Sequence, residues 1–183
     1  VQGDLVKIIV NRTPFYAESG GQIGDKGLIT SQDLEVSIEN VRKKKNIFIH
    51  FGIVSTGVLE INSSVQMNVT PSFRQRTTSN HTATHLLQSA LKLSIDSSVS
   101  QRGSLVSNHR LRFDFNAPKP LTIKELEDIE VRINQWINED HPIQIKTMPI
   151  KEAMAAGALA MFGEKYGDVV RVVDVPGVSM ELC

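Results

Sequence analysis

The stretch at residues 70–75, Thr-Pro-Ser-Phe-Arg-Gln, separates two kinds of sequence pattern. Ser72, followed three residues later by Gln75, has the form of a helix capping box, in which two side chains satisfy free backbone N–H groups at a helix start. We therefore expect a helix to begin near Phe73 and to run over residues 74–93. The sequence has the pattern of strands before this point and begins with a helix after it, which predicts a domain boundary here.

Residues 1–72, before the break, have the pattern of β structure. Short runs of apolar residues, most of them alternating with polar ones, are typical of strands with one buried face. Glycine and Asn/Ser clusters separate the runs. The runs lie at residues 6–10, 34–38, 47–51 and 65–69. Several short strands at this spacing predict a small β-barrel.

Residues 73–183, after the break, mix helices and strands. We expect strands at residues 99–106 and 110–115, then a second helix capped by Thr122 and Glu125, whose apolar residues repeat at helical spacing. A strand, a short helix and two more strands follow, at residues 143–148, 150–156, 169–175 and 178–182. The predicted fold class is α+β, with a small N-terminal β-barrel followed by a two-layer α/β core.

Composition and charge exclude several classes of protein. The 183 residues carry 20 Lys and Arg against 20 Asp and Glu, so contacts with nucleic acid must come from local patches. An aromatic share of 5% argues against a surface that mainly stacks single-stranded bases. No apolar run approaches membrane-spanning length. The single cysteine, Cys183, excludes a disulfide scaffold and favours a reducing compartment, for which we expect the cytoplasm. The chain does not start with methionine, and we expect it to be a piece of a larger polypeptide.

The basic run at residues 42–46 lies between two predicted strands. Runs of this kind are more often solvated hairpin tips than contacts to an RNA backbone, and both interpretations stay open.

Two histidines, His81 and His85, lie four residues apart on the first predicted helix. Their Cβ atoms should be roughly 5–6 Å apart on one face, so both imidazoles could bind one metal ion. At about 100° per residue they fall opposite the apolar stripe of the helix, which disfavours core histidines. A metalloprotease would need Glu where Thr82 stands, so that class is not supported. Two surface histidines without a role are the alternative, and Cys183 is the candidate third ligand because thiolate binds zinc well.

Two further segments are candidate binding elements. Residues 15–27 are rich in glycine, which permits positive φ and close approach of backbone to a ligand. Strand-like residues follow them, which argues against a dinucleotide-binding motif, and a tight turn in a barrel is the alternative. Residues 100–105 form a polar strand that could line a pocket. No serine-histidine-acid triad stands out.

Taken together, these segments resemble alanyl-tRNA synthetases. The matching stretches occur in the family order and span nearly the whole chain. They are residues 12–25 (RTPFYAESGGQIGD), 80–87 (NHTATHLL), 100–106 (SQRGSLV), 111–115 (LRFDF), 161–167 (MFGEKYG) and 179–183 (SMELC). The resemblance implies the editing region of that family, with a small barrel followed by a core shared with threonyl-tRNA synthetase and free-standing editing proteins.

The resemblance also implies an activity, which is hydrolysis of the ester between serine, or glycine, and the terminal ribose of tRNA(Ala). Zn²⁺ would be bound by His81, His85 and Cys183, together with a histidine four residues beyond Cys183, outside this sequence. The site is therefore expected to be weak or empty in this chain. Zinc would either activate water or hold the terminal ribose, and both roles stay open. The ligation of alanine with ATP is expected to belong to the rest of the synthetase chain.

By the same resemblance, three polar residues would line the amino-acid pocket and two glycines would lie near it. The pocket residues are Thr84, Gln101 and Ser104, and the glycines are Gly20 and Gly21. Three arginines, Arg102, Arg110 and Arg112, are candidate contacts to the tRNA acceptor stem, with solvated strand arginines as the equal alternative. A free-standing deacylase, or a tRNA-docking module with a structural zinc ion, are the alternative functions.

Overall fold

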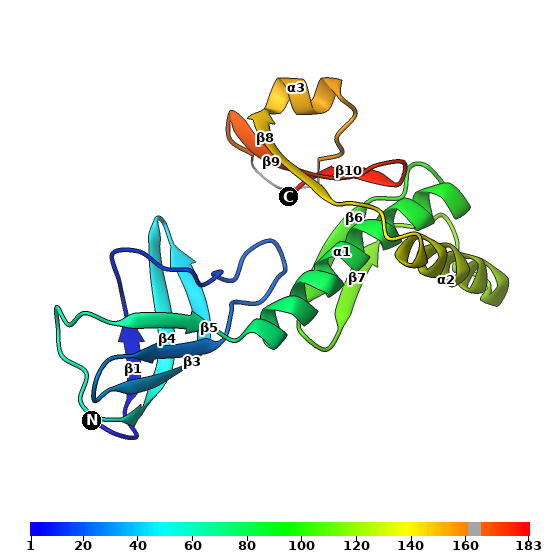
Figure 1. The fold of residues 1–183 in the computed structure, drawn as a ribbon. Coiled ribbons are helices and arrows are strands. Elements are labelled where there is room, and N and C mark those ends of the chain that lie inside the picture. The colour runs from blue at the N-terminus through cyan, green and yellow to red at the C-terminus, as the bar shows by residue number, and fades with distance from the viewer. Residues whose placement is uncertain (161–165) are drawn as a thin grey trace. The chain divides into compact units, whose positions relative to one another are not determined.

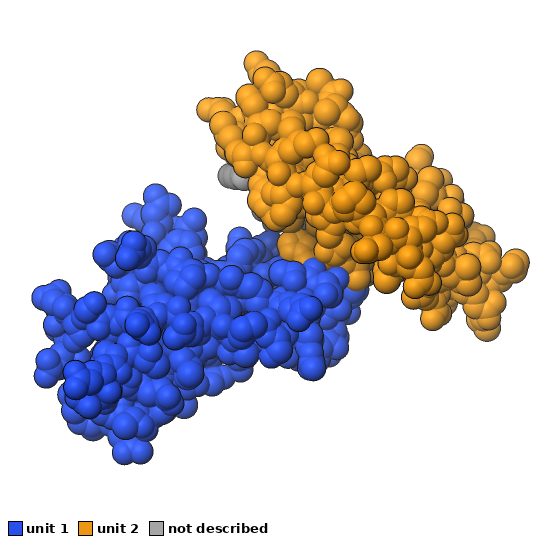
Figure 2. Space-filling model, in the orientation of Figure 1, with its two compact units in different colours: residues 1–80, 105–111 blue, residues 81–104, 112–183 orange. Residues whose placement is uncertain are grey.

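The computed structural model describes residues 1–160 and 166–183 and confirms a mixed α+β chain (Figure 1). The chain divides into two compact units (Figure 2). Unit 1 comprises residues 1–80 and 105–111, and unit 2 comprises residues 81–104 and 112–183. Most of the motif expected at residues 161–167 lies outside the described residues. The boundary predicted between residues 72 and 73 stays a prediction.

Unit 1 is built on an antiparallel five-stranded sheet in the order β1-β4-β3-β2-β5. The strands are β1 (Leu5–Ile8), β2 (Gly27–Thr30), β3 (Glu35–Lys44), β4 (Ile47–Thr56) and β5 (Gln66–Val69). Alternate residues such as Val36, Ile38 and Val54 are buried in a core with Phe15 and Ile29. Strands β1 and β5 are the two edges, and no ladder joins them within the described residues. The closed barrel predicted from the sequence is therefore not confirmed.

Strand β2 was expected only as strand-like residues after the glycine-rich segment, without bounds, because it is four residues long and begins at a glycine. A Cβ on Gly27 would lie 2.1 Å from the carbonyl oxygen of Asn68 on β5, so the close pairing of these strands requires glycine there. The basic run is a hairpin, as one of its two interpretations had it: β3 pairs with β4, and the chain turns at Lys45 with φ of 55°.

Helix α1 (Pro71–Ser94) replaces the strands at the expected place but begins earlier than predicted. The carbonyl of Thr70 accepts the hydrogen bond of the N–H four residues on, at 3.2 Å. Pro71 takes the first helical position, where its fixed φ suits the helix and its missing N–H costs nothing. Ser72 thus lies inside the helix, and the capping box predicted for Ser72 and Gln75 is wrong.

The remaining elements agree closely with the predicted ones. They are β6 (Gln101–Val106), β7 (Leu111–Phe115), α2 (Ile123–Asn138), β8 (Gln144–Pro149), α3 (Ile150–Ala155), β9 (Val169–Val175) and β10 (Ser179–Leu182). The capping box at the start of α2 is confirmed, since Thr122 Oγ1 accepts from the N–H of Glu125 and the Glu125 carboxylate accepts from the N–H of Thr122. In unit 2, Ile129 of α2 packs with Ala90 and Leu91 of α1.

A tight turn sets the register between β9 and β10 in the β10-β9-β8 sheet. The N–H of Val178 donates to the carbonyl of Val175 at 2.9 Å, and Pro176 and Gly177 (φ 79°) fill the turn, as is typical of type II. Side chains then alternate along β10. Met180 and Leu182 pack into the apolar cluster of this sheet, which leaves Glu181 and Cys183 to the other face.

None of the helices in the described part of the chain combines the length and apolar character needed to cross a lipid bilayer.

Candidate metal centre

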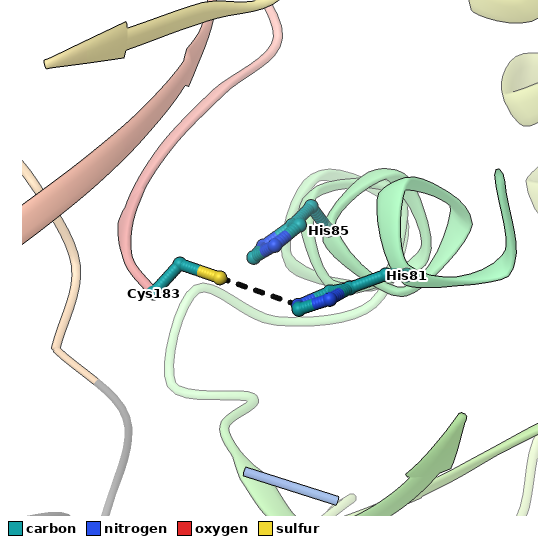
Figure 3. Close-up of side chains that lie close together, drawn as sticks. All are labelled: His81, His85 and Cys183. Carbon is teal, nitrogen blue, oxygen red and sulfur yellow. Dashed lines mark hydrogen bonds between the residues drawn. The ribbon is translucent and has the colours of Figure 1, made fainter. Parts of the chain in front are cut away.

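Residues His81 and His85 of α1 converge with Cys183, which directly follows β10 (Figure 3). The two imidazole rings stack, with centroids 5.1 Å apart and an interplanar angle of 15°. The Sγ atom of Cys183 lies 3.3 Å from Nε2 of His81. One ligand atom from each of the three residues lies within 4.8 Å of the others. The three side chains therefore come together as expected, and their role as zinc ligands stays a proposal.

The burial of this site differs from the expectation. His85 is only 3% exposed, so the alternative of two surface histidines is wrong for this residue. The helix is covered on two sides, by the apolar cluster around Leu91 and by the polar side chains of Glu181 and Cys183. The apolar residues of the helix sequence indicate the face that packs on the Leu91 cluster. They give no indication that polar side chains bury the opposite face.

A fourth residue of the site, Glu181, was not recognised from the sequence. It is 1% exposed, and its carboxylate accepts a hydrogen bond from Nδ1 of His85. The other ring nitrogen, Nε2, is buried without a hydrogen-bond partner among the described residues. A buried polar atom without a partner is costly, whereas a metal-binding histidine commonly donates one nitrogen to a carboxylate and offers the other to the ion. The sequence feature that could have identified Glu181 is the alternation of side chains along a strand, which puts residues two apart, such as Glu181 and Cys183, on the same face.

The donor set of two imidazoles and a thiolate is one that zinc prefers. With His85 Nε2 unpartnered, the described residues fit such an ion.

The pKa values at the site shift in opposite directions. Burial alone would lower the pKa of His85, but its interactions with the nearby Cys183 and with the hydrogen-bonded carboxylate of Glu181 outweigh burial and raise the pKa to about 9. Burial would raise the pKa of Cys183, but its hydrogen bond with His81 and its interaction with the nearby His85 ring outweigh burial and lower the pKa to about 6. Near neutral pH the site therefore favours a thiolate beside a protonated His85. Thiolate is the form that binds metal, and the proton on His85 must leave when an ion binds.

The three predicted pocket residues lie on two elements of unit 2. Thr84 is buried on α1, and its hydroxyl donates to the carbonyl of His81 at 2.6 Å, so this bond stays within the helix. On β6, the side-chain amide of Gln101 donates to Oγ of Ser104 at 3.2 Å. The structure brings Gln101 and Ser104 together.

The two predicted glycines form a tight turn in unit 1. Gly20 and Gly21 have φ of 56° and 80°, and the backbones of Ser19 and Gln22 exchange hydrogen bonds of 3.1 and 2.9 Å across them. Two-residue turns with positive φ at both positions favour glycine strongly. The turn therefore accounts for the conformation of these residues, and a substrate bound near them stays a proposal.

The three predicted arginines are exposed. Arg102 and Arg112 lie on β6 and β7, and Arg110 ends a turn in which Ser107 N–H donates to its carbonyl at 2.9 Å. The guanidinium of Arg112 lies 3.1 Å from the carboxylate of Asp114, which offsets its charge. Exposure agrees with both the tRNA-contact and the solvated-arginine interpretation.

Comparison with known proteins identifies the chain's relatives. A family model described as tRNA synthetases class II (A) matches residues 1–72. The whole chain is 97% identical to part of an alanine--tRNA ligase of Prochlorococcus marinus (strain NATL1A) and 58% identical to that of strain MIT 9515. It is 56% identical, over 99% of its length, to that of Synechococcus elongatus. In each case the chain spans 21% of the relative's length. The chain therefore belongs to the alanine--tRNA ligase family, as a segment of about one fifth of such a protein.

Proposed function

We propose that this chain is an aminoacyl-tRNA deacylase that removes serine or glycine from tRNA(Ala). The observation that carries the proposal is the cluster of His81, His85 and Cys183, in which the buried Nε2 of His85 is left for a ligand. Family membership supplies tRNA(Ala) and the rest of the synthetase chain as partners. We propose that the whole protein ligates alanine to tRNA(Ala) with ATP and works in the cytoplasm.

The three ligands would hold Zn²⁺, which when bound supplies either activation of water or an anchor for the terminal ribose. Each protein ligand has a clear task. Cys183 offers a thiolate, His85 offers Nε2, and His81 completes a set on the same helix face. A histidine four residues beyond Cys183, expected from the resemblance, would complete the tetrahedral set.

Selection for serine would come from the polar residues of unit 2. A side-chain amide has two N–H donors and one acceptor, and Gln101 uses one donor on Ser104, so the rest of the amide is suited to the serine hydroxyl. A site built to bond a substrate hydroxyl can reject the analogue without it by roughly 10⁴-fold, because its own polar groups would lose their partner. Alanine, the correctly attached amino acid, lacks this hydroxyl. Thr84 and Ser104 complete the proposed lining.

The remaining assignments rest on the resemblance and on charge. The exposed guanidinium groups of Arg102, Arg110 and Arg112 are proposed to bind acceptor-stem phosphates, and Gly20 and Gly21 are proposed to bind substrate through their backbone. A barrel for residues 1–72 and a two-layer editing core for residues 73–183 are proposed on the same grounds. The relatives named above favour the editing region of a synthetase over a free-standing deacylase.

The test compares deacylation of seryl-, glycyl- and alanyl-tRNA(Ala) in the presence of Zn²⁺, by this chain and by a chain extended to the expected fourth ligand. Gln101→Leu is expected to slow serine removal by about 1–3 kcal/mol of transition-state stabilisation, the cost of an unpaired polar group. Thr84→Val should act in the same direction. Gln135→Leu, the same kind of change on the exposed face of α2, is the matched control.

Three results would be decisive. An unchanged ratio of serine to alanine removal in both Gln101→Leu and Thr84→Val would remove these residues from the selection mechanism. Binding of tRNA and zinc without hydrolysis would overturn the deacylase proposal in favour of a docking module with structural zinc. Hydrolysis that survives His81→Ala and His85→Ala would separate the activity from the metal cluster.

A further inference from the structure

We propose that Glu181 is the positioning residue of the metal centre, fixing the ring of His85 so that Nε2 faces the ion. This inference rests on the proposed metal site and goes beyond its three ligands. The residue contacts the His85 ring and acts through it.

With Glu181 ionised, the hydrogen bond between Glu181 and His85 has one direction. An ionised carboxylate only accepts hydrogen bonds, so Nδ1 of His85 must carry the proton that it donates. In the neutral ring that a metal requires, Nε2 then carries a lone pair and no proton. That atom is buried, has no hydrogen-bond partner among the described residues, and belongs to the cluster with Cys183 and His81. The carboxylate thus selects both the tautomer and the ring orientation that metal binding needs.

The backbone holds Glu181 rigidly in this place. Its strand, β10, pairs with β9 through the register Glu181↔Val173, and the bridge between Leu159 and Glu181 pairs its other edge. Its neighbours Met180 and Leu182 are anchored in the apolar cluster on the opposite face. A carboxylate fixed on both edges of its strand leaves His85 little freedom to rotate.

A purely structural role does not explain a carboxylate here. Both His85 and Glu181 are almost fully buried, at 3% and 1% exposure. The second carboxylate oxygen, Oε1, has no hydrogen-bond partner within the described chain. Burying a charged group is costly, and an apolar residue of similar volume would usually pack as well or better. The bond to His85 is the contact that requires this residue type.

The first experiment measures zinc affinity in the 183-residue chain by competition with a chromophoric chelator. Because loss of an outer-shell partner weakens metal binding by about 10–100-fold, Glu181→Ala should lower the affinity by that factor. Glu181→Gln should lower it less, since its amide oxygen can accept the same hydrogen bond in the same volume. Glu127→Ala, on the exposed face of α2, is the control and should leave the affinity unchanged.

The second experiment is a double-mutant cycle with His85→Ala. If Glu181 acts through His85, then Glu181→Ala should change zinc affinity by less than about twofold once His85 is absent, the scatter expected of independent sites. A full loss in both backgrounds would overturn the proposal in favour of a general structural role. The thermal unfolding of each metal-free variant shows whether it folds, and Glu181→Gln carries the test if the alanine variant does not.

Two spectroscopic readouts separate positioning from stability. In the metal-free chain, above about pH 9 where the His85 ring is neutral, its ¹⁵N shifts should report a proton held at Nδ1, and Glu181→Ala should lose this preference. With Co²⁺ as the probe, Glu181→Ala should keep the thiolate-to-metal band of Cys183 and change the ligand-field bands. Unchanged ring shifts and bands would overturn the proposal.

The same measurements distinguish this proposal from the deacylase proposal. If the chain binds zinc and gives the expected double-mutant cycle but hydrolyses no seryl-tRNA(Ala), the role of Glu181 stands and the deacylase proposal fails. If the chain extended to the expected fourth ligand also binds no zinc, both the site and its positioning residue are removed.

Discussion

Each compact unit buries one histidine almost completely, and the two are used in opposite ways. In unit 1, His50 donates from Nδ1 to the carbonyl of Ile8 at 3.1 Å and accepts at Nε2 from the hydroxyl of Thr13 at 2.8 Å. Its ring also meets that of Phe15 edge-on, with centroids 5.5 Å apart. In unit 2, His85 bonds through Nδ1 to Glu181, and its Nε2 has no hydrogen-bond partner among the described residues.

The difference shows that binding capacity depends on what the neighbours leave unused. Burial lowers the pKa of His50 and outweighs the Ile8 hydrogen bond, so this ring stays neutral and holds loop to strand. The acidic neighbours of His85 raise its pKa to about 9 in spite of burial. Burial alone would have ranked the two histidines together. Their hydrogen-bond partners distinguish them: His50 is a structural residue and His85 is a candidate ligand.

The largest expected effect comes from removing the thiolate. Cys183→Ser should weaken zinc binding by more than about 100-fold, beyond the loss caused by an outer-shell change, since a hydroxyl is a poor substitute for thiolate. Isothermal titration with Zn²⁺ measures this loss. The NMR signals of His50 should not move. An affinity within a factor of about three of the original would contradict the role of Cys183 as a ligand.

The next effect concerns stability and belongs to unit 1. His50→Leu leaves the carbonyl of Ile8 and the hydroxyl of Thr13 without the ring, and should cost about 2–4 kcal/mol of unfolding free energy. Urea denaturation measures the loss, with His109→Leu as the control because His109 is exposed in the same unit. Zinc affinity should be equal in the two variants. A loss of zinc binding in His50→Leu but not in His109→Leu would contradict the conclusion that His50 has only a structural role.

The third effect, about tenfold for each pH unit, is a dependence of zinc affinity on pH. Between about pH 6 and pH 9, Cys183 is a thiolate while His85 carries a proton, and metal binding must release that proton. Zinc affinity should therefore rise about tenfold per pH unit over this range and level off above it. Below about pH 6 the dependence should steepen, because the thiolate also takes up a proton. Titrations in matched buffers measure the slope, and the His50→Leu variant should give the same one. A flat profile would show that His85 is not protonated in the free site.

Most secondary structure was predictable because it is encoded locally. The strand over residues 169–175 has the predicted bounds, and α2 begins at its predicted cap. The failures were also local: β2 is short and begins at Gly27, and Pro71 rather than Phe73 starts α1. Sheet closure depends on pairing between distant strands, so a list of short strands could not decide it.

The candidate site was predictable only in part. The spacing of His81 and His85 fixes their common face, but the contact with Cys183 spans 102 positions, and no local pattern encodes it. Donor chemistry and the family resemblance suggested Cys183 as a ligand. Glu181 was missed because a charged residue in a strand is expected to face solvent. Its burial is a property of the packing of β10 against α1.

The turn at residues 175–178 has a consequence for changes in chain length. It fixes which residue of β9 lies opposite each residue of β10, and side chains in a strand point to alternate faces. Inserting or deleting one residue between this turn and Glu181 would exchange the two faces, turning Leu182 toward the histidines and Glu181 into the apolar cluster. Substitutions in the turn that keep its length would leave the faces in place. This segment should therefore tolerate changes of residue type far better than a change of a single residue in length.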